Sequence, residues 1–167
     1  MIGDLFHIKI GKSIDGNKVN KTIGRTAYIT RREVNNGLDG FIDYDENYCQ
    51  TVVPAITIGN ETAEPFVQVF PFYTGTKVNI LTSKSCVSSA ALQFVAQCLR
   101  VNNKKYSYSF TINSTRLRRQ IVCLPVNQED VPDWQYMEEY LKQQINHMIL
   151  VYLSYLHEKS QKVAIKC

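Results

Sequence analysis

Hydrophobic residues recur in short runs along the first half of the chain, and turn signals separate these runs. The runs predict strands at residues 5–10, 27–31, 40–44, 51–58, 66–70 and 78–82. Glycine and asparagine are frequent between them, and Asn36-Gly37 is typical of a tight turn because both residues tolerate a positive φ. The pattern predicts a twisted, mostly antiparallel or mixed sheet with long polar loops.

A helical pattern begins at Ser88, which is suited to cap the first turn. The apolar residues that follow it at helical spacing are Leu92, Val95, Ala96 and Leu99. They predict a short amphipathic helix that packs on the sheet. Further along, residues 121–126 predict one more short strand, which Pro125 closes.

One long segment, residues 133–162, contains no glycine or proline and has acids in its first turns and lysines in its last. It predicts a single helix of roughly 43 Å. Its apolar residues step by three or four and form a seam of Trp134, Met137, Leu141, Ile145, Met148, Tyr152 and Tyr155. Residues 148–156 are almost all apolar, which exceeds what one seam buries. We expect this helix to pack against another helix, from a second copy, a repeat or a different subunit; folding back on its own sheet is the alternative.

These elements predict an α+β fold. It consists of a mixed, twisted β-sheet domain with a short packing helix, followed by one long, coiled-coil-like C-terminal helix. A chain of 167 residues is long enough for one domain with an appendage. We assign residues 1–130 to the sheet domain, 131–162 to the long helix and 163–167 to a tail.

Charge is distributed unevenly along the chain, although the net charge of +4 is modest. Residues 65–128 carry eight basic residues and no acidic one, whereas the segments on either side are mildly acidic. The densest part, residues 101–119, also contains Tyr106 and Tyr108. Such segregation creates a local positive potential and indicates nucleic acid as the partner.

Two stretches are candidates for contact with duplex DNA, because Lys and Arg neutralise phosphates and polar side chains read base edges. One is the polar loop after the first strand with the basic pair beyond it, and the other surrounds residues 101–119. The candidate DNA-binding residues are Lys18, Lys21, Arg31, Arg32, Asn35, Asn36, Lys84, Lys104, Lys105, Tyr106, Tyr108, Arg116, Arg118 and Arg119. Alternatively, the two tyrosines pack on the core, and the three arginines lie in a turn that leads into the strand at 121–126 and form only a solvated face.

Catalytic and metal-binding patterns are absent from the sequence. It has no nucleophile-elbow, phosphate-loop, dinucleotide-binding or zinc-protease motif. Asp43, Asp45 and Glu46 form the one tight acidic cluster, which we interpret as a solvated turn rather than a metal site. The five cysteines lack zinc-site spacing, and we expect them to be reduced and mostly buried. We therefore expect no catalysis, no cofactor and no metal.

No apolar run is long enough to cross a bilayer, and the first twenty residues do not resemble a signal peptide. We expect a cytoplasmic protein without a membrane partner.

Several segments occur in a specific order: GDLFHIKIGKSI, AYITRREVNNGLDGFID, ITIGNETAEPFVQVFPFYTGTKVNIL, NNKKYSYSF, RLRRQIVCLPV and VPDWQYMEEYL. In this order, and over nearly the whole chain, the sequence resembles the target recognition domain of restriction-modification specificity proteins. These are the specificity subunits of type I systems and their type IIB and IIG relatives.

The resemblance implies a non-catalytic module that recognises a DNA sequence and directs a partner adenine methyltransferase and nuclease to it. It also implies that the long helix pairs with another as an antiparallel coiled coil, which sets the distance between two half-sites and docks the methyltransferase. A full type I subunit has two recognition domains and two helices, whereas this chain has one of each. It is therefore a half-length subunit that dimerises, a fragment, or a domain of a fused enzyme.

Two functions of other classes remain open. The first is a protein-interaction or scaffold domain that acts through its long helix, with a basic surface that binds nucleic acid without specificity. The second is a small hydrolase that uses Asp43, Asp45 and Glu46. The sequence does not indicate the target DNA sequence, the oligomeric state, the register of the helices or individual base contacts.

Overall fold

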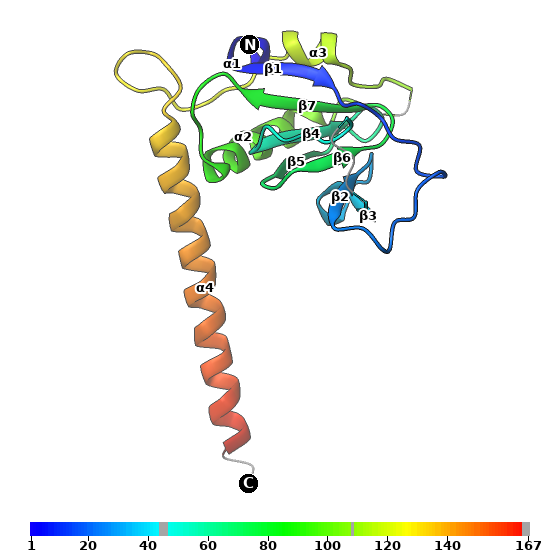
Figure 1. The fold of residues 1–167 in the computed structure, drawn as a ribbon. Coiled ribbons are helices and arrows are strands. Elements are labelled where there is room, and N and C mark those ends of the chain that lie inside the picture. Colours follow the sequence, from blue (N-terminus) through cyan, green and yellow to red (C-terminus); the bar gives the residue numbers. More distant parts are fainter. Residues whose placement is uncertain (44–46, 108, 165–167) are drawn as a thin grey trace.

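The structure, a computed structural model, describes residues 1–43, 47–107 and 109–164 (Figure 1). In chain order, its elements are α1 (Ile2–Leu5), β1 (Phe6–Ile10), β2 (Thr26–Ile29), the 3-10 helix η1 (Asn35–Gly37), β3 (Leu38–Ile42), β4 (Ala55–Gly59), β5 (Pro65–Gln68), β6 (Phe72–Thr74), β7 (Val78–Ser83), α2 (Ser89–Asn103), α3 (Ser114–Arg119) and α4 (Trp134–Ala164).

The strands form two sheets rather than one. The first sheet has the order β1-β7-β4-β5, and all its neighbours are antiparallel. The second has the order β3-β2-β6, in which β2 runs antiparallel to β3 and parallel to β6. Together with the helices, these sheets confirm the predicted α+β class.

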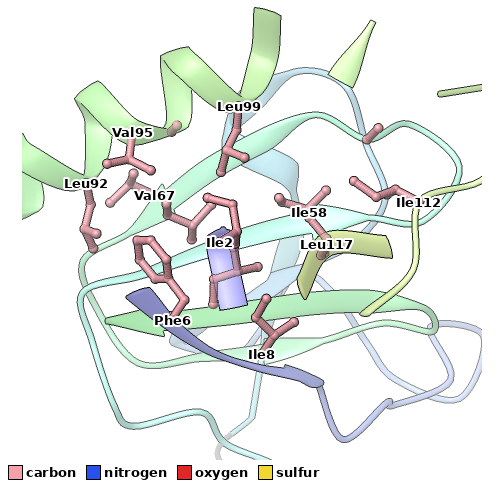
Figure 2. Packing of buried hydrophobic residues seen from close by; sticks show 14 of the residues in the cluster. Ile2, Phe6, Ile8, Ile58, Val67, Leu92, Val95, Leu99, Ile112 and Leu117 are labelled. Carbon is pink, nitrogen blue, oxygen red and sulfur yellow. The ribbon is translucent and has the colours of Figure 1, made fainter. Parts of the chain in front are cut away.

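The first sheet lies in the middle of three layers. Helices α1, α2 and α3 cover one of its faces, where Phe6, Ile58 and Leu92 belong to the largest buried cluster (Figure 2). The second sheet covers the other face, where Ala55 and Ile80 pack against Ile29 and Phe72. Successive residues of a strand point to opposite faces, so every residue of β4 is buried.

The long loop between β2 and β3 ends in a left-handed turn. The φ angles of Asn35, Asn36 and Gly37 are 53°, 55° and 72°. Asparagine and glycine adopt this conformation at the lowest cost, and the turn predicted at Asn36-Gly37 is confirmed. It leads directly into β3.

Two predicted features are wrong, and one strand was not predicted. Residues 121–126 form no strand: Pro125 has no N–H to donate to a ladder, and Val126 forms only an isolated bridge, to Pro132. The short strand β6 was not predicted, since Pro71 and Gly75 leave its apolar run too short to recognise. The arginines at 116–119 belong to a helix, α3, whose N-cap is Asn113, rather than to a turn.

The four cysteines that the structure describes are free, but they are less buried than predicted. Cys86 and Cys123 are exposed, and Cys49 and Cys98 are half-buried. Cys167 lies outside the described residues.

Side-chain caps begin both long helices. Ser88 accepts a hydrogen bond from the Ala91 N–H at 3.2 Å, as predicted, and Asp133 accepts one from the Tyr136 N–H at 2.9 Å. Each cap satisfies an N–H that lacks a partner within its helix. None of the described helices is long and apolar enough to span a membrane.

Helix α4 packs on the domain with its first turns and then leaves it (Figure 1). Met137 is fully buried in the main core, Trp134 packs against that core, and the rings of Phe94 and Tyr140 meet edge to face at 5.6 Å. Trp134 and Met137 therefore do not belong to a seam for another helix. These first turns pack on α2 of the same domain, whereas the alternative predicted packing on the sheet.

The predicted helix ends two residues early. The structure continues α4 to Ala164, and residues 165–167 of the predicted tail lie outside the described residues. The division into segments 1–130, 131–162 and 163–167 stays a prediction.

Candidate nucleic-acid interface

Six basic side chains come from the loops between β1 and β2, between β2 and β3 and between β6 and β7, from the segment after α2, and from α3. We call Lys21, Arg31, Arg32, Lys77, Lys105 and Arg116 the basic edge. In Figure 1, the β2 and β3 end of the domain lies on the side away from α4. The part of α4 that extends beyond the domain, which we call the arm, and the basic edge are therefore separate surfaces.

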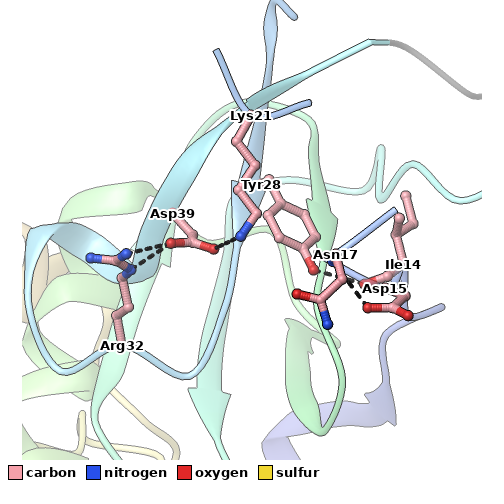
Figure 3. A network of polar contacts seen from close by, with 7 residues as sticks. All are labelled: Ile14, Asp15, Asn17, Lys21, Tyr28, Arg32 and Asp39. Carbon is pink, nitrogen blue, oxygen red and sulfur yellow. Dashed lines mark hydrogen bonds and ion pairs between the residues drawn. The ribbon is translucent and has the colours of Figure 1, made fainter. Parts of the chain in front are cut away.

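Asp39 on β3 holds the first pair of cations (Figure 3). The Lys21 ammonium lies 2.8 Å from Oδ2, and the Arg32 guanidinium donates from Nε to Oδ1 at 2.8 Å. The Asp39 side chain is 13% exposed, whereas those of Lys21 and Arg32 are 34% and 50% exposed. The carboxylate therefore lies beneath two outward-facing cations.

Glu61, in the turn between β4 and β5, holds a second pair in the same manner. Its Oε2 lies 2.6 Å from Arg31 Nη1, and its Oε1 lies 3.3 Å from Lys77 Nζ. Glu61 is 14% exposed, and the two cations are 38% and 63% exposed. Adjacent residues Arg31 and Arg32 thus bind different carboxylates and point in different directions.

Both carboxyl groups are ionised at neutral pH. Partial burial alone would raise the pKa of Asp39, but the hydrogen bonds and charges of Lys21 and Arg32 outweigh burial and lower it. The pKa of Glu61 follows the same balance, with burial opposed by Arg31 and Lys77, and it is also lowered. These are the environments of stable ion pairs rather than of catalytic acids.

The predicted stretch after α2 forms a stack of rings and cations. Lys105 Nζ lies 5.3 Å from the centre of the Tyr106 ring, and Tyr106 stacks on Phe110 at 5.6 Å. The Arg116 guanidinium lies 4.1 Å from the centre of the Phe110 ring, and it also donates to the Thr111 carbonyl. Cation–π contacts of this kind hold the charges in place without neutralising them.

The β4–β5 turn joins the stack to the Glu61 pair. The Asn60 N–H donates to the Lys77 carbonyl at 3.0 Å, and the Ile112 N–H donates to the Asn60 carbonyl at 2.9 Å. At the end of α2, the buried Asn103 amide donates to the Ala63 carbonyl at 2.7 Å. These bonds fix the two parts of the basic edge relative to each other.

Other predicted DNA-binding residues are tied to the fold or lie elsewhere. Lys84 follows β7 at the end opposite Lys77 and donates to the Gly3 carbonyl at 2.8 Å. Arg118 donates to the Ile8 carbonyl at 2.6 Å, and the Asn36 amide donates to Gln68 Oε1 at 3.2 Å. These three side chains thus also hold parts of the fold in place; all three are exposed, and their assignment to DNA contact stays a prediction.

The remaining candidates divide by burial. Lys18, Asn35, Lys104 and Arg119 are exposed, so they stay candidates. Tyr106 is half-buried and packs against the main core, which favours the packing alternative for this tyrosine. Tyr108 lies outside the described residues.

Sequence reasoning missed four members of this surface: Asp39, Glu61, Lys77 and Phe110. The two carboxylates belong to the acidic first part of the chain, and nothing in their spacing indicates that each is paired with two cations. Lys77 lies within residues 65–128, which contain no acidic residue, and this position in the sequence was the one indication that it could belong to a basic surface. It has a φ of 57°, unusual for lysine, at the turn before β7.

Metal binding has no support among the described residues, which contain no group of three or more His, Cys, Asp or Glu placed to hold an ion. Asp43 is exposed. Asp45 and Glu46, the other members of the predicted acidic cluster, lie outside the described residues.

Beyond the domain, α4 exposes an extensive apolar surface. Its large hydrophobic side chains that are at least two-fifths exposed include Ile145, Met148, Ile149, Leu150, Val151, Tyr152, Leu153, Tyr155 and Leu156. A shallow groove runs along His147, Met148, Val151, Tyr152 and Tyr155. A surface of this size marks an interaction site.

Comparison with known proteins agrees with this arrangement. Residues 1–151 match the family described as the type I restriction modification DNA specificity domain. The type II restriction enzyme specificity subunit S.BcgI of Heyndrickxia coagulans is 44% identical over 149 residues, which is 89% of this chain and 43% of that subunit. The chain therefore spans less than half the length of this curated relative.

Solved structures share the fold. The HsdS subunit from Thermoanaerobacter tengcongensis has a TM-score of 0.63 at 13% identity, over 92% of this chain and 38% of that one. A chain from a structural study of complex assembly and conformational transition in the type I restriction-modification system has a TM-score of 0.62 at 12% identity, over 96% and 41%.

The match covers the sheet domain, the basic edge and the first half of α4. Both the family description and the relative's name refer to specificity, which confirms the prediction of a non-catalytic component. The chain belongs to the family of type I restriction modification DNA specificity domains.

Proposed function

We propose that this chain recognises a specific sequence in duplex DNA and directs a partner adenine methyltransferase and a nuclease to that sequence. The observation that carries the proposal is the family match over residues 1–151. The basic edge supplies a surface with the required charge.

The basic edge contains both kinds of group that DNA recognition needs. Exposed lysines neutralise phosphates and give affinity without sequence preference. Arginine can form paired hydrogen bonds to the O6 and N7 atoms of guanine in the major groove. Arg31 and Arg32 lie on a loop carried by a rigid sheet, which is a usual position for residues that recognise a ligand.

The apolar part of α4 supports a partner helix. We propose that this helix is either that of a second copy, which would give a homodimer, or a segment of a longer chain. The curated relative is more than twice as long as the matched region, so both arrangements supply a second helix. The methyltransferase would dock on the paired helices, and the complex would act in the cytoplasm.

The test is selection from a randomised duplex DNA pool by the chain with its methyltransferase partner, at near-physiological salt, followed by sequencing. We expect one asymmetric motif to be enriched. A variant with Arg31→Ala and Lys77→Ala should lose the enrichment, whereas Lys142→Ala on α4, which also removes a positive charge, should keep it. Binding that disappears as salt rises, with no enriched motif, would refute the proposal.

Salt-sensitive binding without an enriched motif would favour the other candidate function, that of a protein-interaction domain. The exposed apolar side chains of α4 would then be the functional element, and the basic edge would bind nucleic acid without specificity. Association through α4 with no DNA preference is the pattern expected of such a domain.

A further inference from the structure

We infer that Asp39 and Glu61 are specificity-determining residues, which act by fixing the directions of the four cations that would face DNA. The inference rests on the proposed function and concerns how the same surface distinguishes one DNA sequence from another. Neither residue would itself need to touch a base. Each is a positioning residue that acts through the lysine and the arginine it holds.

The same arrangement of one carboxylate and two cations occurs at Asp39 and at Glu61. Each carboxylate bridges one arginine and one lysine, and each is less than half as exposed as either of the cations that it holds. The first carboxylate belongs to a strand, and the second follows β4 by two residues. Asp39 is therefore anchored on a strand and Glu61 in a turn directly after one, while the charges that they hold reach outward from loops.

The backbone of β3 beside Asp39 is also held closely against the backbone of Lys21. The Phe41 N–H donates to the Lys21 carbonyl at 2.9 Å. A Cβ atom at Gly40 would lie 2.5 Å from the same carbonyl oxygen, so only glycine permits this approach. Lys21 is thus fixed to β3 through its main chain and through its ammonium group.

A polar hollow lies between the two pairs. It has a volume of about 280 Å³, and its lining includes Lys21 and Asp39 from the first pair and Arg31 from the second. Tyr28 closes one side, and its hydroxyl donates to the Ile14 carbonyl at 2.7 Å (Figure 3). Cations from both pairs therefore border a common space with fixed walls.

Two physical effects then favour specificity. Long side chains lose rotamer freedom when they bind, and pre-ordering them places this cost in folding instead of in DNA binding. The two carboxylates also offset half of the charge of the four cations, which weakens attraction to any DNA whose groups do not match their directions. Cations held in fixed directions therefore contribute their full binding free energy to the matching DNA sequence and little to other sequences.

The test replaces each carboxylate by its amide. Asp39→Asn and Glu61→Gln keep the shape, remove one negative charge and release the cations. Glu129→Gln is the matched control, because it makes the same charge change at an exposed loop residue for which the described residues provide no ion pair. Dissociation constants are measured for the selected duplex and for a scrambled duplex of equal length over a range of salt concentrations.

We expect the two affinities to move in opposite directions in Asp39→Asn and in Glu61→Gln. The scrambled duplex should bind about twofold to fivefold more tightly, and the ratio between the duplexes should fall about tenfold. In Glu129→Gln, both duplexes should bind slightly more tightly at an unchanged ratio. Loss of fold would instead weaken both together, and thermal unfolding of each variant identifies that case.

An unchanged ratio in both folded variants would overturn the inference, as would equal weakening of both duplexes in a variant that unfolds like wild type. If one variant does not fold, the other decides the question, because the two carboxylates lie in separate ion-pair groups. A wild-type chain with no preference for any duplex would refute the proposed function itself. A selective wild type with equally selective variants would refute the inference alone.

Discussion

Two methionines on one helix provide a matched test of where the domain ends and the arm begins. Met137 has no exposed surface and belongs to the main core, whereas Met148, three turns further along α4, is 61% exposed. The substitution to alanine removes the same atoms at both positions. The difference between the two variants therefore measures environment alone.

The expected magnitude follows from burial. Removal of a buried methionine side chain to Cβ costs the transfer free energy of its atoms plus a cavity term, and Met→Ala in a core costs about 2–5 kcal/mol. We expect Met137→Ala to lower the free energy of unfolding by about 3 kcal/mol, which for a chain of this size shifts Tm by roughly 6–12 °C. An exposed position such as Met148 should change it by less than about 0.5 kcal/mol.

The measurement is urea unfolding of the isolated chain at low concentration, combined with sedimentation equilibrium at high concentration. Met148→Ala should leave the unfolding curve unchanged and weaken self-association, whereas Met137→Ala should lower stability at any concentration. Equal effects on unfolding at low concentration would refute the division of α4 into a packed base and a free arm. If the wild-type chain forms a dimer and Met148→Ala associates equally strongly, the exposed face of α4 around Met148 is not the dimer interface.

Three further outcomes are expected. The pKa values of Asp39 and Glu61 are lowered in the folded chain, so their stabilising contribution is complete above the ordinary values of 3.8 and 4.5 and is lost as pH falls through the lower folded values. Denaturation at a series of acid pH values should show a weaker decline for Asp39→Asn than for wild type. Ser88→Ala removes the cap of α2 and should cost about 1 kcal/mol in urea unfolding; an unchanged midpoint would contradict the cap. Phe110→Ala removes the ring on which Arg116 packs and should weaken binding to all duplexes by a similar factor in a filter assay, whereas Phe70→Ala, at a site 76% exposed, should not.

Local patterns in the sequence were sufficient to identify most of the strands and both long helices. Helix α2 was predicted correctly because its signals are local: Ser88 caps the first turn, and Leu92 and Leu99 lie on one buried face. Both features depend on residues that are near one another in the chain. The 121–126 run failed because an apolar run becomes a strand only where another strand edge is free to pair with it. Ile121 instead remains 73% exposed.

The candidate interface was less accessible to sequence reasoning. The cluster of arginines near residue 116 was evident, but whether an arginine faces solvent or holds the backbone depends on tertiary contacts. Arg118 binds the carbonyl of Ile8, far away in the chain. The pairing of Asp39 with Lys21 and Arg32 similarly depends on how a strand meets two loops, which composition does not reveal.

The pairing of β1 with β7 has a consequence for how the chain folds. Phe6 lies opposite Ser83, so the first strand finds its partner only after most of the domain has been synthesised. Closing so long a loop costs entropy before any contact compensates, and proteins dominated by such distant pairings fold slowly. Until β1 arrives, the edge of β7 and the core beneath Ile2 stay open. An extension fused before Met1 that delays this closure would lengthen the period in which the chain can aggregate, even if it left the finished domain unchanged.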